Sequence, residues 1–249
     1  MTQSRNYDDP CGIARALDVI GDRWALLVVR ELVFGPKRFL QLRAGLRTVS
    51  PNVLSQRLRD LEAAGIVRRD ELAPPASVAV YELTDRGRAL EPVLLELGRW
   101  GSQEPIATSR ELSPDALMVA LKTAFDPSGA PAHGSFALDV GAGTFTVVVA
   151  DGTITISRGR LGDSAVAISG ASATMRAVVF GRERIADAER AGRLTVAGDR
   201  ALAERFTRMF PVQPGPTSWT RQAHPRAMTR SSPSLAKKSS SLDQPNMAS

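Results

Sequence analysis

The chain has 249 residues, of which 43% are hydrophobic and 23% charged, as in a globular protein with room for two hydrophobic cores and a tail. No apolar run approaches the roughly 20 residues that span a bilayer, and the start MTQSRNYDD lacks the order of a secretory signal, so we expect a cytoplasmic protein. One cysteine and two distant histidines exclude a disulfide framework and argue against zinc, and the modest net charge of +6 matters mainly through its distribution.

The chain opens with three predicted helices. The first covers residues 11–20, the second follows through ALLVVREL and ends at Phe34-Gly35-Pro36, and the third takes RFLQLRAG. A turn then leads to Ser50, a favourable N-cap with Pro51 at the first helical position. This order predicts a helix-turn-helix.

The helix that begins at Ser50 is predicted to face two ways. Leu54, Leu58 and Leu61 form one apolar stripe, while polar residues project from the other side. Gly65 stops the helix, and residues 66–69 and 78–83 form two short alternating strands around a turn at Ala73, Pro74 and Pro75. This hairpin is the wing of a winged helix, a fold that binds DNA.

Positive charge concentrates on this part of the chain. Residues 34–69 hold eight lysines and arginines against two acids, so their net charge is 8 − 2 = +6. Glutamine and arginine on the helix suit base edges, whereas cations beside it suit phosphates, although a solvated helix face is the alternative and Arg57 is also placed to pair with Asp60 or Glu62. The predicted DNA contacts are Lys37, Arg38, Ser50, Asn52, Ser55, Gln56, Arg57, Arg59, Arg68 and Arg69.

After the wing, Thr84 is predicted to cap a long helix that reaches Trp100. Its stripe of Leu90, Leu94 and Leu97 exceeds what a small trihelical core absorbs, so we expect this helix and the first one to form a dimer seam. The DNA-binding domain therefore covers residues 1–101, and a linker over residues 102–112 follows.

A second domain is predicted over residues 113–210. It opens with a helix capped by Ser113 and Pro114, continues with the strands SFALDV, TFTVVVA, TITIS and AVAIS, and ends with helices around the strand RLTVAG. Consecutive strands indicate an α+β fold. Residues 103–210 carry 12 basic and 12 acidic residues, so they have no electrostatic footprint for nucleic acid. Residues 211–249, rich in Pro and Ser, are expected to be a disordered tail.

The apolar residues of the second domain are candidates for a ligand cavity, although for each residue taken singly an ordinary core is the favoured interpretation. No serine, histidine and acid set and no Cys/His pair has usable spacing, so we expect no enzyme, no cofactor and no metal. The predicted lining is Phe136, Leu138, Phe145, Val147, Ile156, Met175 and Val179, with Val149, Ile154, Val166, Ile168 and Val178 beside them.

The first 101 residues resemble the HxlR group of winged-helix transcription regulators, relatives of the MarR type, through CGIARALDVIGDRW, RFLQLRAGL, VSPNVLSQRLRDLEAAGIV and YELTDRGRAL. The resemblance implies a homodimer on a palindromic operator, with residues 50–64 in the major groove. It also places Cys11 where many of these proteins carry a redox-reactive thiol. A small residue at a helix start explains Cys11 equally well, and the chain has no second cysteine to resolve an oxidised one.

Residues 113–210 resemble a sterol-carrier-protein-like lipid-binding domain through ERIADAERAGRLTVAGDRALAERFTRMF. That resemblance implies an apolar site for fatty-acyl or sterol-like ligands. We therefore expect a dimeric, sequence-specific repressor controlled by a small apolar ligand or by redox. The alternative is a lipid carrier whose winged helix serves dimerisation, and it is weakened by the retained basic face of the helix from Ser50.

Overall fold

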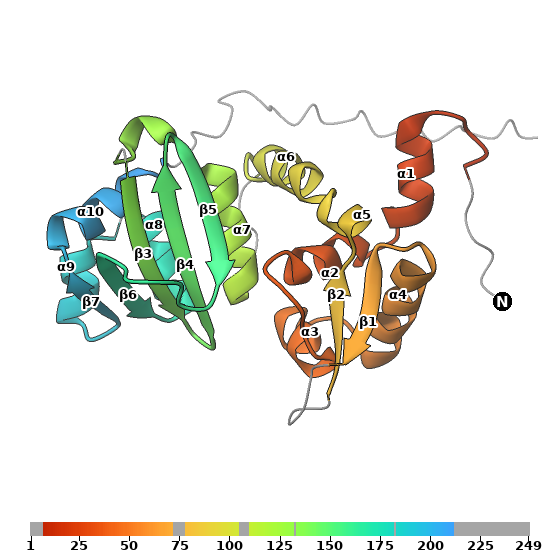
Figure 1. Cartoon of the computed structure of the whole chain (residues 1–249), viewed down its shortest axis with the longest axis horizontal. Helices are drawn as coiled ribbons and strands as arrows, with labels where there is room; N and C mark the ends of the chain where they lie inside the picture. The colour runs from red at the N-terminus through yellow and green to blue at the C-terminus, as the bar shows by residue number, and fades with distance from the viewer. Residues whose placement is uncertain (1–6, 72–77, 105–109, 132, 182, 212–249) are drawn as a thin grey trace, which may run out of the picture. The chain divides into compact units, whose positions relative to one another are not determined.

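The computed structural model describes residues 7–71, 78–104, 110–131, 133–181 and 183–211 (Figure 1). Four helices come first, α1 (Gly12–Ile20), α2 (Ala25–Leu32), α3 (Phe39–Gly45) and α4 (Pro51–Ala63), and they confirm the predicted helix-turn-helix order. Trp24 is the N-cap of α2, and its φ of 81° is not a helical value, so α2 begins after it as a separate helix. Within the described residues, none of the helices reaches the length and apolarity of a bilayer-crossing segment.

The wing is a two-stranded antiparallel sheet of β1 (Val67–Glu71) and β2 (Ala79–Leu83). Its first pair, Val67 opposite Leu83, packs into the core of the helices, where α4 contributes its leucine stripe. The other edge of β2 is bridged by Lys37, which pairs with Tyr81. The predicted turn at residues 73–75 lies outside the described residues.

The prediction of one long helix from Thr84 to Trp100 is wrong, because the structure divides this segment into two helices. Thr84 does cap a helix, accepting the Gly87 N–H at 3.1 Å, but this helix is the single turn α5 (Asp85–Arg88). A separate helix, α6 (Glu91–Gly101), follows with Pro92 in its first turn. Proline has no N–H to give to the preceding turn, so the helix restarts there. Leu94 is buried, while Leu97 is exposed.

The second sheet has five strands in the order β5-β4-β3-β6-β7. The strands are β3 (His133–Val140), β4 (Gly143–Ala150), β5 (Thr153–Arg158), β6 (Val166–Gly170) and β7 (Leu194–Gly198). Asp151 and Gly152, both at positive φ, make the tight turn that joins β4 to β5. All neighbours are antiparallel except β3 and β6, which pair in parallel because β6 returns past the β4–β5 hairpin.

Helices cover one face of this sheet. They are α7 (Pro114–Ala124), α8 (Ser172–Val179), α9 (Ile185–Arg190) and α10 (Arg200–Arg208), with a short 3-10 turn, η1 (Pro127–Gly129), after α7. Along β3, Phe136, Leu138 and Val140 are fully buried toward the helices, and α8 lies behind the sheet in Figure 1. The α+β class is confirmed. Residues 105–109 of the predicted linker and 212–249 of the predicted tail lie outside the described residues.

Candidate functional site

The helix α4 is fixed by its cap and by its buried stripe. The Ser50 hydroxyl accepts the Val53 N–H at 3.3 Å, which satisfies one of the free donors of the first turn. Leu54, Leu58 and Leu61 are at most 1% exposed. A helix anchored along one whole face presents its other face in a defined orientation.

That outer face brings together most of the predicted base-reading residues. Asn52, Gln56 and Arg59 are exposed, and Ser55 is half-buried. The Arg59 guanidinium donates to the Gln56 carbonyl oxygen at 2.6 Å, and the Gln56 amide donates to the Asp60 carboxylate at 2.8 Å. The two side chains are thus held side by side, with the planar donors that suit guanine and adenine edges.

Arg57 does not belong to this face. It forms an ion pair with Asp22 and a second one with Asp60, at 3.2 Å, and its side chain is 13% exposed. The pairing with Asp60 is one of the alternatives that the sequence left open. Because these two carboxylates hold the guanidinium and the side chain is largely buried, the structure argues against Arg57 as a base contact.

Lys37 is the clearest correction to the predicted phosphate contacts. It is 7% exposed, and its Nζ lies 2.8 Å from Glu31 Oε2 and 2.6 Å from Asp115 Oδ2. An ammonium that is buried and bound to two carboxylates is not accessible to a phosphate at the surface. Lys37 is therefore part of the interior of the described structure.

Glu31, at the centre of this arrangement, is fully buried. Burial by itself raises the pKa of Glu31, but the charges of Lys37 and Arg30 and hydrogen bonds from Lys37 and Ser113 outweigh it, so the pKa is lowered. The carboxylate is thereby held in its ionised form.

The remaining predicted phosphate contacts divide into two kinds. Arg38, at the N-cap of α3, and Arg69, in β1, are exposed and have no ion pair within the described residues. Arg68 is exposed as well, but it pairs with Glu82 across the wing at 2.5 Å, and this hydrogen bond raises the pKa of Arg68. Arg38 and Arg69 are accordingly the more available cations.

Two further cations were counted in the sequence but not proposed as contacts. Arg43 lies at the end of α3 and Arg47 in the turn before α4, and both are exposed without an ion pair in the described part of the chain. Their position at and just after the end of the first helix of the helix-turn-helix was the signal that could have included them.

Cys11 is exposed and immediately precedes α1. Its backbone N–H donates to the Asp9 carboxylate at 2.8 Å, and its side chain makes no capping hydrogen bond. Cys11 is therefore exposed rather than packed, which weakens the alternative that it is only a small structural residue at a helix start.

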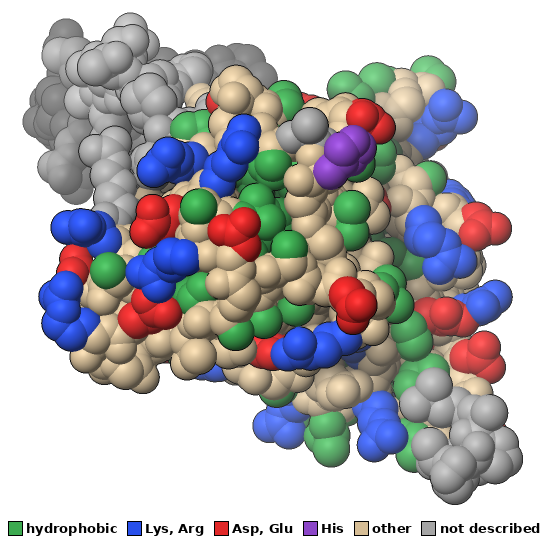
Figure 2. Space-filling model, turned by 60° about the vertical axis from the view of Figure 1, so that its left-hand side comes forward, with side chains coloured by type: hydrophobic (Ala, Val, Ile, Leu, Met, Phe, Trp, Pro, Cys, Tyr) green, Lys and Arg blue, Asp and Glu red, His purple; other side chains and the backbone are tan. Residues whose placement is uncertain are grey.

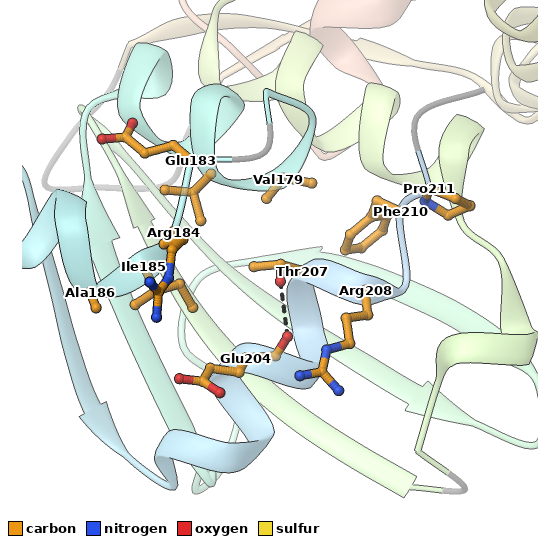
Figure 3. Close-up of a pocket in the computed structure, with 11 residues that line it drawn as sticks. Val179, Glu183, Arg184, Ile185, Ala186, Glu204, Thr207, Arg208, Phe210 and Pro211 are labelled. Carbon is orange, nitrogen blue, oxygen red and sulfur yellow. Dashed lines mark hydrogen bonds between the residues drawn. The ribbon is translucent and has the colours of Figure 1, made fainter. Parts of the chain in front are cut away.

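The second domain contains a pocket of about 460 Å³ between α8, α9 and α10. Figure 3 shows Val179, Ile185 and Phe210 around it, with Arg184 and Arg208 at its rim. Neither arginine has an ion pair among the described residues, in contrast to Glu183 on the same rim, which binds Arg193. The pocket thus combines an apolar wall with two unpaired cations.

The predicted cavity residues mostly lie elsewhere. Only Val179 of the seven lines this pocket, and Val178 from the wider set joins it. The others belong to a closed core in which each is at most 7% exposed, namely Phe136, Leu138, Phe145, Val147, Ile156 and Met175. Ring packing explains the closure, since Phe136 contacts Phe206 with centroids 4.8 Å apart. These six residues are therefore part of an ordinary hydrophobic core, which was the alternative interpretation of the sequence.

Charge on the second domain is mixed. Figure 2 shows basic and acidic side chains interspersed over the face in view, in line with the equal numbers of both in residues 103–210. The described residues contain no group of three or more His, Cys, Asp or Glu side chains arranged to hold a metal ion.

Comparison with known proteins assigns both parts. Residues 19–107 match the HxlR-like helix-turn-helix model, and residues 126–211 match the SCP-2 sterol transfer family. Two Bacillus subtilis relatives match the first part, the HTH-type transcriptional regulators YvaP and YodB. YvaP is 39% identical over 89 residues, which are 36% of this chain and 82% of YvaP. YodB is 35% identical over 88 residues, which are 35% of this chain and 79% of YodB.

Solved structures match the same region. Quinone-bound YodB from B. subtilis is 33% identical and covers 37% of this chain and 97% of its own, with a TM-score of 0.33. The redox regulator HypR in its oxidised form is 35% identical, and the match covers 38% of this chain and 98% of the HypR chain, with a TM-score of 0.35. With its helix-turn-helix and wing in place, this chain belongs to the HxlR-like helix-turn-helix family and carries a second, SCP-2-like domain.

Proposed function

We propose that the protein is a sequence-specific transcription regulator that binds a palindromic operator as a homodimer and represses transcription. The observation that carries this proposal is the outer face of α4, where Asn52, Gln56 and Arg59 are exposed on a helix anchored by a buried leucine stripe. The unpaired Arg38 and Arg69 flank that helix in the chain. The names of the relatives YvaP and YodB support the same activity.

The test is selection of duplex DNA from a random library by the full chain, followed by gel-shift titration. Arg59→Ala should lose roughly 1–3 kcal/mol of binding to the selected duplex and relax its specificity, because a bidentate contact to a base is removed. Arg190→Ala, which removes an exposed arginine of the second domain, is the matched control and should bind like wild type. Unchanged affinity in a folded Arg59→Ala protein would exclude Arg59 from the interface.

We propose that the second domain and Cys11 control this activity. The pocket between α8, α9 and α10 offers Val178, Ile185 and Phe210 to an apolar ligand. A ligand that alters operator affinity by a regulatory amount, about 1–3 kcal/mol, must have its own affinity altered by DNA by the same factor. Native mass spectrometry for co-purified lipid, then operator titration with and without that lipid, decides between a sensor and an attached carrier.

Redox control is the second input that we propose. The exposed thiol of Cys11 and the oxidised and quinone-bound states named for HypR and YodB support it. Because Cys11 is the sole thiol of the sequence, any disulfide that it forms is a bond between subunits or to a small-molecule thiol. Diamide or quinone should change operator affinity in wild type and leave Cys11→Ser unaffected, and an equal response in both would remove this input.

A lipid carrier with a winged helix used only for dimerisation is the second candidate function. The pocket and the SCP-2 match favour it. If the full chain selects no duplex and lipid co-purifies with it, the function as a lipid carrier would be favoured over the function as a regulator.

A further inference from the structure

A buried ionic cluster joins the helix-turn-helix to the second domain. Lys37 reaches Glu31 of α2 at 2.8 Å and Asp115 of α7 at 2.6 Å. Glu31 is fully buried and Asp115 is 3% exposed. Charges are taken out of water at a high cost unless they are paired, so these three groups depend on one another for their burial.

Each carboxylate oxygen of the cluster has a partner. Glu31 Oε1 accepts from Arg30 at 2.8 Å and from the Ser113 hydroxyl at 2.6 Å, while Arg158 of β5 donates to Asp115 Oδ1. Ser113 is also the N-cap of α7, accepting the Ala116 N–H at 3.0 Å. The first turn of α7 is therefore tied at Ser113 and Asp115 to a residue of α2 and to Lys37.

The backbone of Lys37 is tied to the wing. Its N–H donates to the Tyr81 carbonyl oxygen at 2.9 Å, and the Tyr81 N–H donates back to the Lys37 carbonyl oxygen at 2.8 Å. Tyr81 lies in the middle of β2, directly opposite Arg69 of β1. One residue thus contacts the second domain through its side chain and the wing through its main chain.

Apolar packing supports the same junction. Phe34, three residues before Lys37, is buried in the core of the second domain with its ring edge-to-face against Phe145, at a centroid distance of 5.8 Å. At the other end of α7, a Cβ on Gly98 of α6 would lie only 3.0 Å from the Thr123 hydroxyl. Because α7 is packed this closely against α2 and α6, its displacement cannot leave the junction unchanged.

On its second-domain side, α7 contacts α8, and α8 supplies Val178 and Val179 to the pocket. A continuous set of contacts therefore runs from the pocket through α8 and α7 to Lys37 and the wing. Contiguity alone does not establish coupling, which requires an element whose state both ends change.

We propose that Lys37 is a coupling residue, through which α7 of the second domain holds the wing in place. Its ammonium binds Asp115 while its backbone pairs with Tyr81, so release of Asp115 leaves the side chain held by Glu31 alone and loosens the pairing with β2. Any effect of this coupling on DNA affinity rests on the proposed function, whereas its effect on the wing does not.

The direct test is hydrogen exchange in the full chain, because the amides of Lys37 and Tyr81 are the two that form the bridge. Asp115→Asn removes the charge with little change in shape and should speed exchange of both amides about tenfold. Asp139→Asn is the matched control, since Asp139 is a half-buried carboxylate of β3 bound by Arg160 and Ser169, and it should leave both rates unchanged.

Two results would overturn the proposal. One is unchanged exchange of Lys37 and Tyr81 in folded Asp115→Asn. The other is an equal acceleration at Leu58 in the middle of α4, which would indicate general destabilisation. If Asp115→Asn does not fold, Ser113→Ala replaces it. This change removes the hydrogen bond from an uncharged hydroxyl to the Glu31 carboxylate together with the N-cap of α7, and it should speed bridge exchange about threefold while Leu58 stays protected.

Gel-shift titration with the duplex selected by wild type extends the test to DNA. Asp115→Asn should change affinity for that duplex several-fold, although Asp115 is buried and lies in the second domain, and Asp139→Asn should not. If wild type selects no duplex, the proposed function fails while the exchange experiment still decides the role of Lys37. If affinity stays constant while bridge exchange rises, the wing is held by Lys37 but does not contribute to binding, which overturns the consequence for DNA.

Discussion

Replacement of Lys37 by methionine separates a structural role from a DNA contact. Methionine keeps most of the apolar stem, so the cavity that it leaves is small and the main change is loss of the ammonium. At an effective dielectric constant of 20, each of the two contacts, at 2.8 and 2.6 Å, is worth about 6 kcal/mol of Coulomb attraction before the desolvation of Lys37 is subtracted.

The net loss is smaller than that sum. Removal of one partner from a buried ion pair costs about 3–5 kcal/mol, because a charge is left buried and unpaired. In this cluster Glu31 keeps Arg30 and Asp115 keeps Arg158, so we expect the lower end of that range, about 3 kcal/mol. With a urea m-value of about 3 kcal/mol/M, the midpoint should fall by about 1 M.

Two assays on the full chain test this. Urea unfolding followed by circular dichroism measures the midpoint, and gel shifts at several salt concentrations measure the salt slope of binding to the selected duplex. Lys37→Met should keep the wild-type slope, whereas Arg69→Ala should flatten it by about two units, because one phosphate contact is lost from each subunit of the proposed homodimer. A stable Lys37→Met protein with a flattened slope would refute the structural role and restore the phosphate contact that the sequence predicted.

Three further predictions concern the cluster and the proposed dimer. Because the pKa of Glu31 is lowered, its stabilising contribution is present above about pH 4.5 and lost as pH falls through the lowered value, so Glu31→Gln should flatten the acidic part of the urea-midpoint profile. Gly45→Ala should destabilise the chain by about 1–3 kcal/mol in the same assay, since its Cβ would lie 2.2 Å from Glu31 Oε2. Ile13→Glu, at a residue of α1 that is 72% exposed, should convert the dimer to a monomer in light scattering, and Leu161→Glu, 58% exposed in the second domain, should not.

Features that depend on a few neighbouring residues were predictable from the sequence. The caps at Ser50, Thr84 and Ser113 each accept an N–H three residues ahead, as their residue types indicate. The strands of both sheets were located by alternation and turn residues. The break between α5 and α6 had a local signal in Pro92, which the regular leucine spacing outweighed in the prediction.

Features that depend on distant partners were not predictable in the same way. The parallel pairing of β3 with β6 requires knowledge of how the chain returns past an intervening hairpin. The burial of Lys37 depends on Asp115, 78 residues away, and composition around Lys37 gives no sign of it. For the same reason the candidate ligand site moved from the sheet, where the periodic apolar residues lie, to the space between α8, α9 and α10.

Ion pairing also changes what the positive charge of the DNA-binding part can do. Of the eight basic residues in positions 34–69, Lys37 is buried, Arg57 binds Asp22 and Asp60, and Arg68 binds Glu82, so 8 − 3 = 5 remain without a carboxylate partner among the described residues.

The five remaining arginines are exposed and lie on α3, on α4, in the turn between these helices and on β1. The proposed homodimer would carry ten of them, which at about 0.9 per phosphate limits their part of the salt slope to about 9. A steeper slope would require cations outside positions 34–69. The basic residues that first indicated DNA binding therefore divide into two groups. Three are buried or paired with carboxylates within the fold, and the other five are available for phosphates and bases.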